Sequence, residues 1–444
     1  MGSQGTQLQA EPVRGESQIQ RWSPATRVAF RFCFVYFGLY CFFTQISASL
    51  IPVANVDIPE LSSLWPMRHI VTWSAAHILR IATPVTYVET GSGDRIFDWV
   101  MLFCLLVIAT VATLVWSLLD GQRENYATLY KWFRLAIRLC LAGQMFSYGL
   151  VKIFPLQMPY PYLTKLIEPF GNFSPMGVLW SSIGSSPRYE MFAGSAEMLG
   201  GILLIVPRTT MLGALVCLAD MTQVFMLNMT YDVPVKLLSF HLILLSLFLL
   251  APDLRRLANL LFLDRPAGPS TQPPLFATRR ANRIALAAQV IFCAVLVGVN
   301  VYGGWSGWHQ FRGPAFKSAL YGIWDVDQLV IDGQTRSPLL TDYGRWRRAI
   351  FDFPSRMSFQ RMDSSMARFG ASIDAKKQTV ALTKDDDKNW KSSFTFQRPA
   401  PDQLILDGTM DGQKVHMKLQ LVDRAKFLLV SRGFHWVQEQ PFNR

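Results

Sequence analysis

The chain has 444 residues, is 50% hydrophobic and only 17% charged, and carries a formal net charge of +12. Soluble domains carry about 25% charged residues, so this composition excludes an ordinary soluble protein and indicates an integral membrane protein. The sequence has no basic and aromatic pattern of the kind that indicates nucleic acid as a partner. Its six cysteines form no Cys-x-x-Cys pair, which argues against a disulfide framework or a zinc site.

The first two thirds of the chain are predicted to be α-helical. Residues 1–27 are polar and are expected to form a disordered cytoplasmic tail. A membrane-spanning helix needs about 20 mostly apolar residues, and an amphipathic stretch at 64–82 is expected to lie along the membrane surface. The sequence offers about seven membrane-spanning helices, at 28–53, 96–119, 130–154, 189–206, 209–229, 234–251 and 283–302.

Lys and Arg residues predict the orientation, because they concentrate in short cytoplasmic loops. With a cytoplasmic N-terminus, about twelve of them lie inside and six outside. The predicted parts are N-terminal helices with an outside loop (28–129), a four-helix bundle (130–263), a Pro-rich cytoplasmic linker (264–282) and a last spanning helix (283–302). The final region, 303–444, is then extracytoplasmic, on the periplasmic side of a bacterial inner membrane.

The texture of the sequence changes from about residue 303, where aliphatic runs give way to alternation with a period of two. Strands are predicted at 322–331, 356–362, 367–374, 379–384, 392–398, 402–410, 414–422 and 426–436. Strands at this spacing favour a C-terminal antiparallel β domain, either a closed barrel or another small antiparallel fold.

Charged and polar residues lie within the predicted spans, where they are costly and often mark a site. We consider two interpretations: structural ion pairs between helices, or a site for a ligand or for protons. A third possibility is that some span boundaries are misplaced. Glu197 and Asp220 are the candidates for proton handling. The full set of candidate ligand-binding residues is Arg138, Lys152, Glu197, Asp220, Asp232, Lys236 and His241.

Residues 130–263 resemble the DoxX family of small four-helix membrane proteins. The segment "RLAIRLCLAGQMFSYGLVKIFP" resembles the family's first helix, and "FAGSAEMLGGILLIVPRTTMLGAL" resembles the second, with its Gly-x-x-Glu-x-x-Gly-Gly pattern and Arg-Thr pair. The resemblance implies a four-helix bundle and, through members linked to quinone-dependent enzymes, a quinone as cofactor or ligand. The positions that carry over are Gly194, Glu197, Gly200, Gly201, Arg208, Thr209 and Lys152.

The C-terminal domain carries a shorter resemblance. "YGIWDVDQL" is similar to the Gly-x-Trp opening strand of lipocalin-like barrels, which implies that a late arginine, Arg432, packs over Trp324.

Two functions follow from these observations. In the first, the bundle binds a quinone for a membrane oxidoreductase system and a redox partner protein supplies the electrons, because no haem, flavin or metal motif is apparent. In the second, the protein is a non-catalytic membrane module that binds a lipid or a partner protein. In both, Glu197 faces the bundle interior, pairs with Arg138 or Lys152, and lies in a polar centre that opens toward the loop at 155–188.

Overall fold

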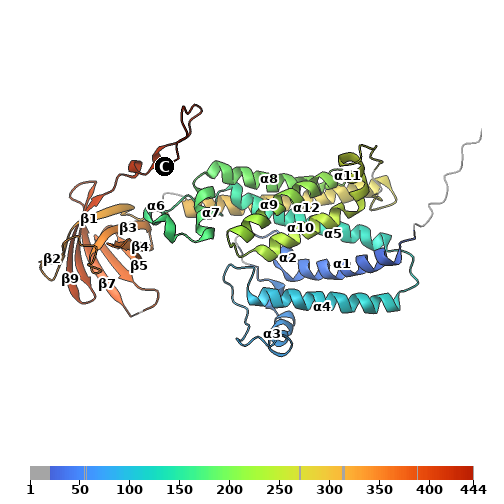
Figure 1. The fold of residues 1–444 in the computed structure, drawn as a ribbon, viewed down its shortest axis with the longest axis horizontal. Helices are drawn as coiled ribbons and strands as arrows, with labels where there is room; N and C mark the ends of the chain where they lie inside the picture. Colours follow the sequence, from blue (N-terminus) through green and yellow to red (C-terminus); the bar gives the residue numbers. More distant parts are fainter. Residues whose placement is uncertain are drawn as a thin grey trace, which may run out of the picture.

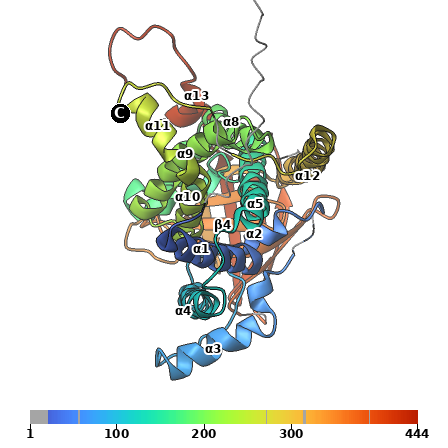
Figure 2. The ribbon, with the colours of Figure 1, turned by 90° about the vertical axis from the view of Figure 1, so that its right-hand side faces the viewer.

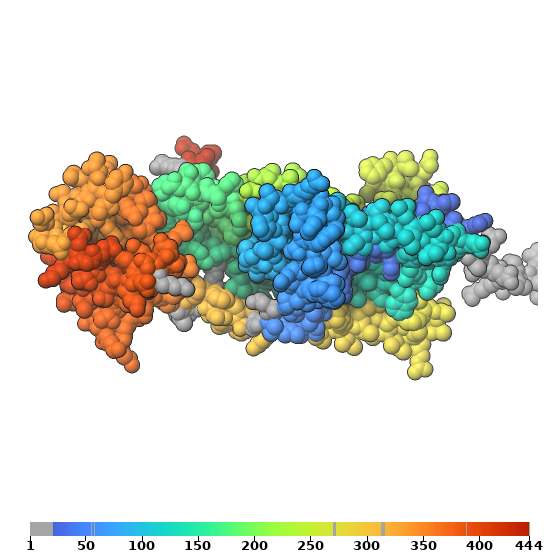
Figure 3. Space-filling view, turned by 90° about the horizontal axis from the view of Figure 1, so that it is seen from below, coloured from blue at the N-terminus to red at the C-terminus, as the bar shows by residue number. Residues whose placement is uncertain are grey.

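The computed structural model describes residues 21–443 apart from 55, 57, 270–271, 313–315 and 388, so most of the predicted N-terminal tail lies outside the described residues. A long helical region is followed by a β-barrel at one end of it, while α11 and the start of α1 lie at the opposite end (Figure 1). From below, the barrel forms a separate lobe that touches the green segment between α5 and α8 (Figure 3). The predicted helical region and C-terminal β domain are both confirmed.

Among the described residues, four α-helices and a 3-10 turn (Leu61–Ser63) precede the bundle. The α-helices are α1 (Pro24–Phe43), α2 (Gln45–Ala48), α3 (Met67–His77) and α4 (Ile96–Leu119). The first predicted span, 28–53, is therefore too long at its C-terminal end, because the helix breaks at Thr44. The amphipathic stretch at 64–82 does contain a helix, and α3 runs across the direction of the long helices (Figure 2).

The bundle consists of α5 (Ala127–Ile153), α8 (Pro187–Ile205), α9 (Thr210–Thr230) and α10 (Lys236–Leu250). Between α5 and α8 the chain forms α6 (Leu163–Ile167), a 3-10 turn and α7 (Pro175–Gly184). After α10 come α11 (Leu254–Leu261) and α12 (Arg279–Arg312), which packs against α5 and is longer than the predicted 283–302.

Five helices among the described residues are long and apolar enough to cross a membrane, judged by length and composition only. They are Pro24–Phe43, Ile96–Leu119, Thr210–Thr230, Lys236–Leu261 and Arg279–Phe311. The other two predicted spans form α5 and α8, helices of 27 and 19 residues that carry the buried charges described below. Helices α4 and α12 expose apolar side chains along their length, as a lipid-facing helix would.

The C-terminal domain is a closed barrel of eight antiparallel strands in sequence order. The strands are β1 (Gly322–Ile331), β3 (Trp346–Phe353), β4 (Arg356–Arg361), β5 (Met366–Asp374), β6 (Thr379–Thr383), β7 (Lys391–Gln397), β8 (Gln403–Met410) and β9 (Gln413–Leu421). Strand β9 pairs back onto β1, and the two-residue β2 (Gln334–Thr335) pairs antiparallel with the last residues of β1. Of the two predicted alternatives, the closed barrel is therefore correct.

The strand predictions contain one omission and one error. Strand β3 was not predicted, because Arg345, Arg347 and Arg348 obscure its start and Ala349–Asp352 are buried on both faces rather than alternating. The predicted strand at 426–436 is instead a turn followed by the short helix α13 (Leu428–Ser431). The β1–β9 pairing leaves no free barrel edge for another strand.

The prediction that Arg432 covers Trp324 was also wrong. Trp324 is fully buried and donates its indole N–H to the carbonyl of Leu320 at 2.9 Å. The cation over its ring is Arg398, 5.6 Å from the ring centroid. The chain after β9 leaves the barrel (Figure 1), so Arg432 instead lies over the ring of Phe442.

Helix α6 joins the helical region to the barrel. The carboxylate of Asp352 on β3 accepts hydrogen bonds from the backbone N–H groups of Leu163 at 2.9 Å and Thr164 at 3.1 Å. Leu163 also packs with Ile323 and Ile350 on the outer face of the barrel. This contact explains why β3 is buried on both faces.

The Asp352 contact predicts a pH dependence. Burial raises the pKa of Asp352 above its ordinary 3.8, and the hydrogen bonds from Leu163 and Thr164 only partly oppose this. A raised folded-state pKa means that the stabilisation is present below the unfolded pKa and is lost as the pH rises through the folded one. As the pH rises from about 3 to about 7, the free energy of opening α6 should fall in the wild type relative to the Asp352→Asn variant. Amide hydrogen exchange at Leu163 and Thr164 measures this free energy.

The control is Asp374→Asn, whose carboxylate caps the backbone of Lys376 and Lys377 within the barrel and does not touch α6. Its exchange at α6 should follow the wild type at every pH. A wild-type opening energy that rises with pH relative to Asp352→Asn would contradict the assignment.

Candidate functional site

A buried ion pair lies between the first two helices of the bundle. The ammonium group of Lys152 on α5 donates to a carboxylate oxygen of Glu197 on α8, and the two residues are 7% and 1% exposed. Gly149 and Gly194 lie where α5 and α8 cross, and the absence of side chains there lets the two backbones approach. Of the two cations predicted to pair with Glu197, Lys152 is therefore the correct one.

A second carboxylate completes the polar centre. Asp220 on α9 lines the same cavity as Lys152 and Glu197. One oxygen of each carboxylate, Oε2 of Glu197 and Oδ2 of Asp220, is buried without a hydrogen-bond partner among the described residues. Buried polar atoms are normally paired, so this centre has unused capacity to bind a proton or a ligand.

The cavity around these groups has a volume of about 120 Å³ and is partly open. Its other lining residues are mainly apolar or aromatic and come from all four bundle helices. Leu179, Trp180 and Ile183 of α7 cover one side. Two hydrogen bonds hold the segment before α6 against α7 and α8. Trp180 Nε1 of α7 donates to the carbonyl of Gln157 at 3.0 Å, and the N–H of Met158 donates to Glu190 of α8 at 2.8 Å.

A second cavity of about 160 Å³ adjoins the first, and Tyr148, Val235 and Leu238 line both. The hydroxyl of Tyr148 accepts a hydrogen bond from Gln45 at 2.8 Å, and its ring lies 5.7 Å from the Lys152 ammonium group. Tyr148 thus lies between the buried ion pair and the polar loops that precede α3 and α4.

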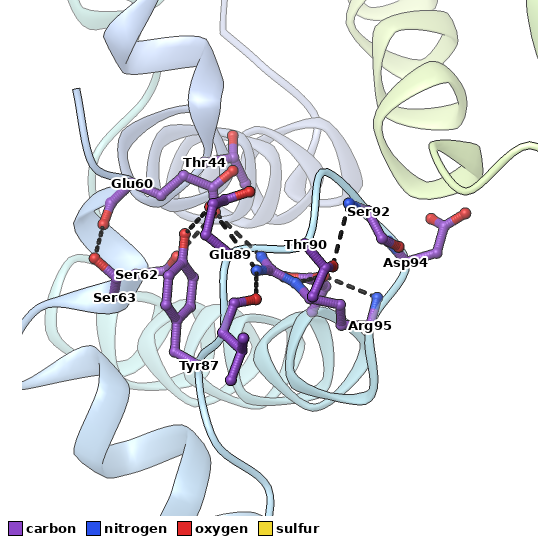
Figure 4. A network of polar contacts seen from close by, with 12 residues as sticks. Thr44, Glu60, Ser62, Ser63, Tyr87, Glu89, Thr90, Ser92, Asp94 and Arg95 are labelled. Carbon is purple, nitrogen blue, oxygen red and sulfur yellow. Dashed lines mark hydrogen bonds and ion pairs between the residues drawn. The ribbon is translucent and has the colours of Figure 1, made fainter. Parts of the chain in front are cut away.

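Side chains of those loops form a polar network (Figure 4), and Glu60, Glu89 and Arg95 of this network line the second cavity. Arg95 donates to Asp98 at 2.8 Å and to the carbonyl of Val88 at 2.6 Å, and lies 3.9 Å from Glu60. Burial and the nearby Asp98 raise the pKa of Glu60, whereas Arg95 opposes that rise. Tyr87 donates to Glu89 at 2.9 Å, which lowers the pKa of that carboxyl.

The structure does not bring the other predicted site residues to this centre. Arg138 lies toward the opposite end of α5, where it donates to the carbonyls of Leu204 at 3.0 Å and Ile205 at 2.7 Å. Because it binds these carbonyls at the end of α8, Arg138 is not the partner of Glu197. Asp232 and Lys236 form a 3.0 Å ion pair in which the Asp232 side chain is 83% exposed.

His241 is a packing residue in this structure. Its ring stacks on Tyr40 with centroids 3.6 Å apart. Nδ1 lies 2.6 Å from the carbonyl of Leu237, which can only accept, so Nδ1 carries the proton and Nε2 accepts from the hydroxyl of Tyr36 at 2.7 Å. Both ring nitrogens are therefore already used.

Sequence reasoning missed two features of the site. The first is the cover formed by α7, whose Trp180 stands in a segment interpreted only as an outside loop; the Ser174-Pro175 pair that starts α7 is a recognisable helix start. The second is Asp94, which accepts from the N–H groups of Lys236 at 2.8 Å and Leu237 at 2.9 Å and so caps α10 from another part of the chain.

The fold and the site together define a class: a helical bundle with membrane-length helices, a buried lysine–carboxylate centre beside a cavity, and a closed β-barrel at one end. The chain is 32% identical over 128 residues to "Uncharacterized protein YwoB" of Bacillus subtilis (strain 168), a match that covers 27% of this chain and 75% of YwoB. The chain belongs to the family of YwoB. No protein-family profile matches the chain, and no solved structure matches it.

Proposed function

We propose that this protein is a DoxX-like integral membrane protein that binds the headgroup of a quinone in the bundle cavity, as a component of a membrane oxidoreductase system. The observation that carries the proposal is the cavity itself, which is lined mainly by apolar side chains and has Lys152, Glu197 and Asp220 in its wall. Ligand sites typically combine an apolar wall with a few convergent polar groups.

The arrangement of the helices supports a place in the cell inner membrane. The five apolar helices have the length to span it. Arg27 stands in the first turn of α1 and Arg256 in α11, and the start of α1 and α11 lie at the end of the helical region opposite the barrel (Figure 1). The positive-inside rule then puts that end in the cytoplasm and the barrel on the extracytoplasmic side.

The side chains suit the chemistry of a quinone. The Lys152 ammonium group can donate to a carbonyl oxygen of the ring, and Glu197 and Asp220 can exchange protons with the reduced oxygens. Conversion to the quinol takes up two electrons and two protons, and a separate redox protein supplies the electrons. A cavity of about 150 Å³ holds a benzene ring, and this one is smaller, at about 120 Å³, but partly open. A quinone ring would therefore occupy both the cavity and its opening, with the isoprenoid tail outside.

Asp220→Asn tests this proposal, because the substitution keeps the shape of the side chain and removes its charge and proton. The folded protein, purified in mild detergent and extracted with organic solvent, should retain about tenfold less quinone per chain, since one hydrogen bond to a charged group is worth this much. Mass spectrometry of the extract measures the ratio.

The matched control is Asp232→Asn, an exposed aspartate on the loop after α9 that does not line the cavity. It should retain quinone at the wild-type ratio. Wild-type protein that carries only bulk phospholipid, and that does not bind added decylubiquinone, would rule the quinone proposal out.

A non-catalytic module that binds a lipid or a partner protein is the second candidate. The observation in its favour is that the barrel docks on α6, in the same connection that covers the cavity through α7. Occupation of the bundle could thereby be transmitted to the barrel surface. In this case bound phospholipid, and not quinone, should change in the Asp220→Asn variant.

A further inference from the structure

A third and larger cavity lies toward the opposite end of the bundle. Its volume is about 840 Å³, and it is bounded by α5, the turn between α8 and α9, the start of α11 and the start of α12. Seven Lys and Arg side chains line it, whereas Asp253 is the one carboxylate among the described lining residues. The quinone proposal makes no use of this cavity.

Two of the seven cations are deeply buried. Arg134 and Arg138 are each 8% exposed. Arg138 binds the carbonyls of Leu204 and Ile205 and the side chain of Gln289, and forms no ion pair among the described residues. The negative end of the α8 dipole stabilises such a cation only in part, so its charge is not neutralised by a carboxylate.

Arg134 is similarly under-satisfied. It donates to the carbonyl of Leu249 at 2.9 Å, and its Nε has no hydrogen-bond partner in the described part of the chain. Its carboxylate neighbour, Asp253, is 3.9 Å away and is bound by Arg256 at 2.6 Å. One carboxylate therefore serves two arginines.

The rim of the cavity adds cations without counter-charges. Arg208 follows α8, and Arg279 and Arg283 stand in the first turns of α12. All three are exposed, and within the described ranges none of them forms an ion pair. Arginines from four parts of the chain, α5, the turn after α8, α11 and α12, line one cavity, which a simple excess of charge along a loop does not require.

We propose that this cavity binds a phosphate-bearing anion, either the headgroup of an acidic phospholipid or a free phosphate compound. Guanidinium groups match phosphate oxygens through paired N–H donors, and sites for small ligands commonly measure about 300–1,000 Å³. Basic pockets between helices on the cytoplasmic side of a membrane protein also suit acidic headgroups.

The test uses the full chain in mild detergent with two probes. The first is phosphatidylglycerol in mixed micelles, compared with phosphatidylcholine, and the second is inorganic pyrophosphate. Binding is measured by native mass spectrometry and by the shift in melting temperature. The doubly substituted variant Arg208→Gln, Arg283→Gln should bind the preferred probe about tenfold or more weakly than the wild type.

The matched control is Arg255→Gln, Arg280→Gln. It removes the same charge from neighbouring exposed positions that do not line the cavity, and it should bind the probe as the wild type does. Selective binding of phosphatidylglycerol identifies a lipid site, and binding of pyrophosphate identifies a site for a free phosphate compound. Equal weakening in the two variants, or no preference for either anion in the wild type, would overturn the proposal.

Discussion

Lys152→Met should destabilise the helical bundle by about 3–5 kcal/mol, the usual cost of leaving one charge of a buried pair without its partner. Glu197 is 1% exposed, and its second carboxylate oxygen has no hydrogen-bond partner among the described residues, so no other described side chain compensates for the lost ammonium group. Thermal unfolding in detergent, followed by circular dichroism, measures the loss.

The double variant Lys152→Met, Glu197→Met separates stability from ligand binding. Apolar residues of similar volume often replace a buried ion pair at little cost, so the double variant should recover most of the stability of the single one but still bind no quinone. Lys377→Met is the control, because the side chains of Lys377 and of its ion-pair partner Asp374 are 80% and 43% exposed; loss of such a pair costs about 1 kcal/mol or less. A double variant as unstable as Lys152→Met would show that the ion pair itself is required for folding.

Gly194→Ala should also have a large effect, although it adds one methyl group. The new Cβ would lie 2.8 Å from Cβ of Lys152 and 3.0 Å from the backbone N of Ile153, distances that force α5 and α8 apart. Overpacking of this kind costs about 1–3 kcal/mol, and it moves Lys152 away from Glu197. We expect a lower melting temperature and loss of bound quinone.

Gly298→Ala is the matched control, because it is also a helical glycine but no atom lies within 4 Å of the added Cβ. Alanine favours a helix over glycine by about 1 kcal/mol, so this variant should be as stable as the wild type or slightly more so. A Gly194→Ala protein with wild-type stability would mean that α5 and α8 do not cross as closely as described.

The features that the sequence could predict are those encoded within one segment. Apolar runs identified the long helices, and alternation identified seven of the eight barrel strands. The missing strand, β3, is buried on both faces by α6, whose sequence lies almost 190 residues earlier. No local pattern contains that information.

The partners of the charged residues were predictable only when they were other side chains. Lys152 and Glu197 are complementary charges, and their pairing was one of two predicted possibilities. Arg138 binds backbone carbonyls at the end of α8. Every residue has a backbone carbonyl, so the sequence does not show which of them an arginine will bind. The capping of α10 by Asp94 was not predictable for the same reason, because Asp94 binds the backbone N–H of Lys236, 142 positions later in the chain.

The docking of α6 on β3 also imposes an order on biosynthesis. The ribosome completes all four bundle helices before it makes Asp352, the residue that holds Leu163 and Thr164. Until the barrel has folded, the connection between α5 and α8 is held only by contacts of its own, such as the bonds of Trp180 to Gln157 and of Met158 to Glu190. A newly made chain therefore passes through a stage in which the bundle helices are complete and Leu163 and Thr164 have no partner on the barrel.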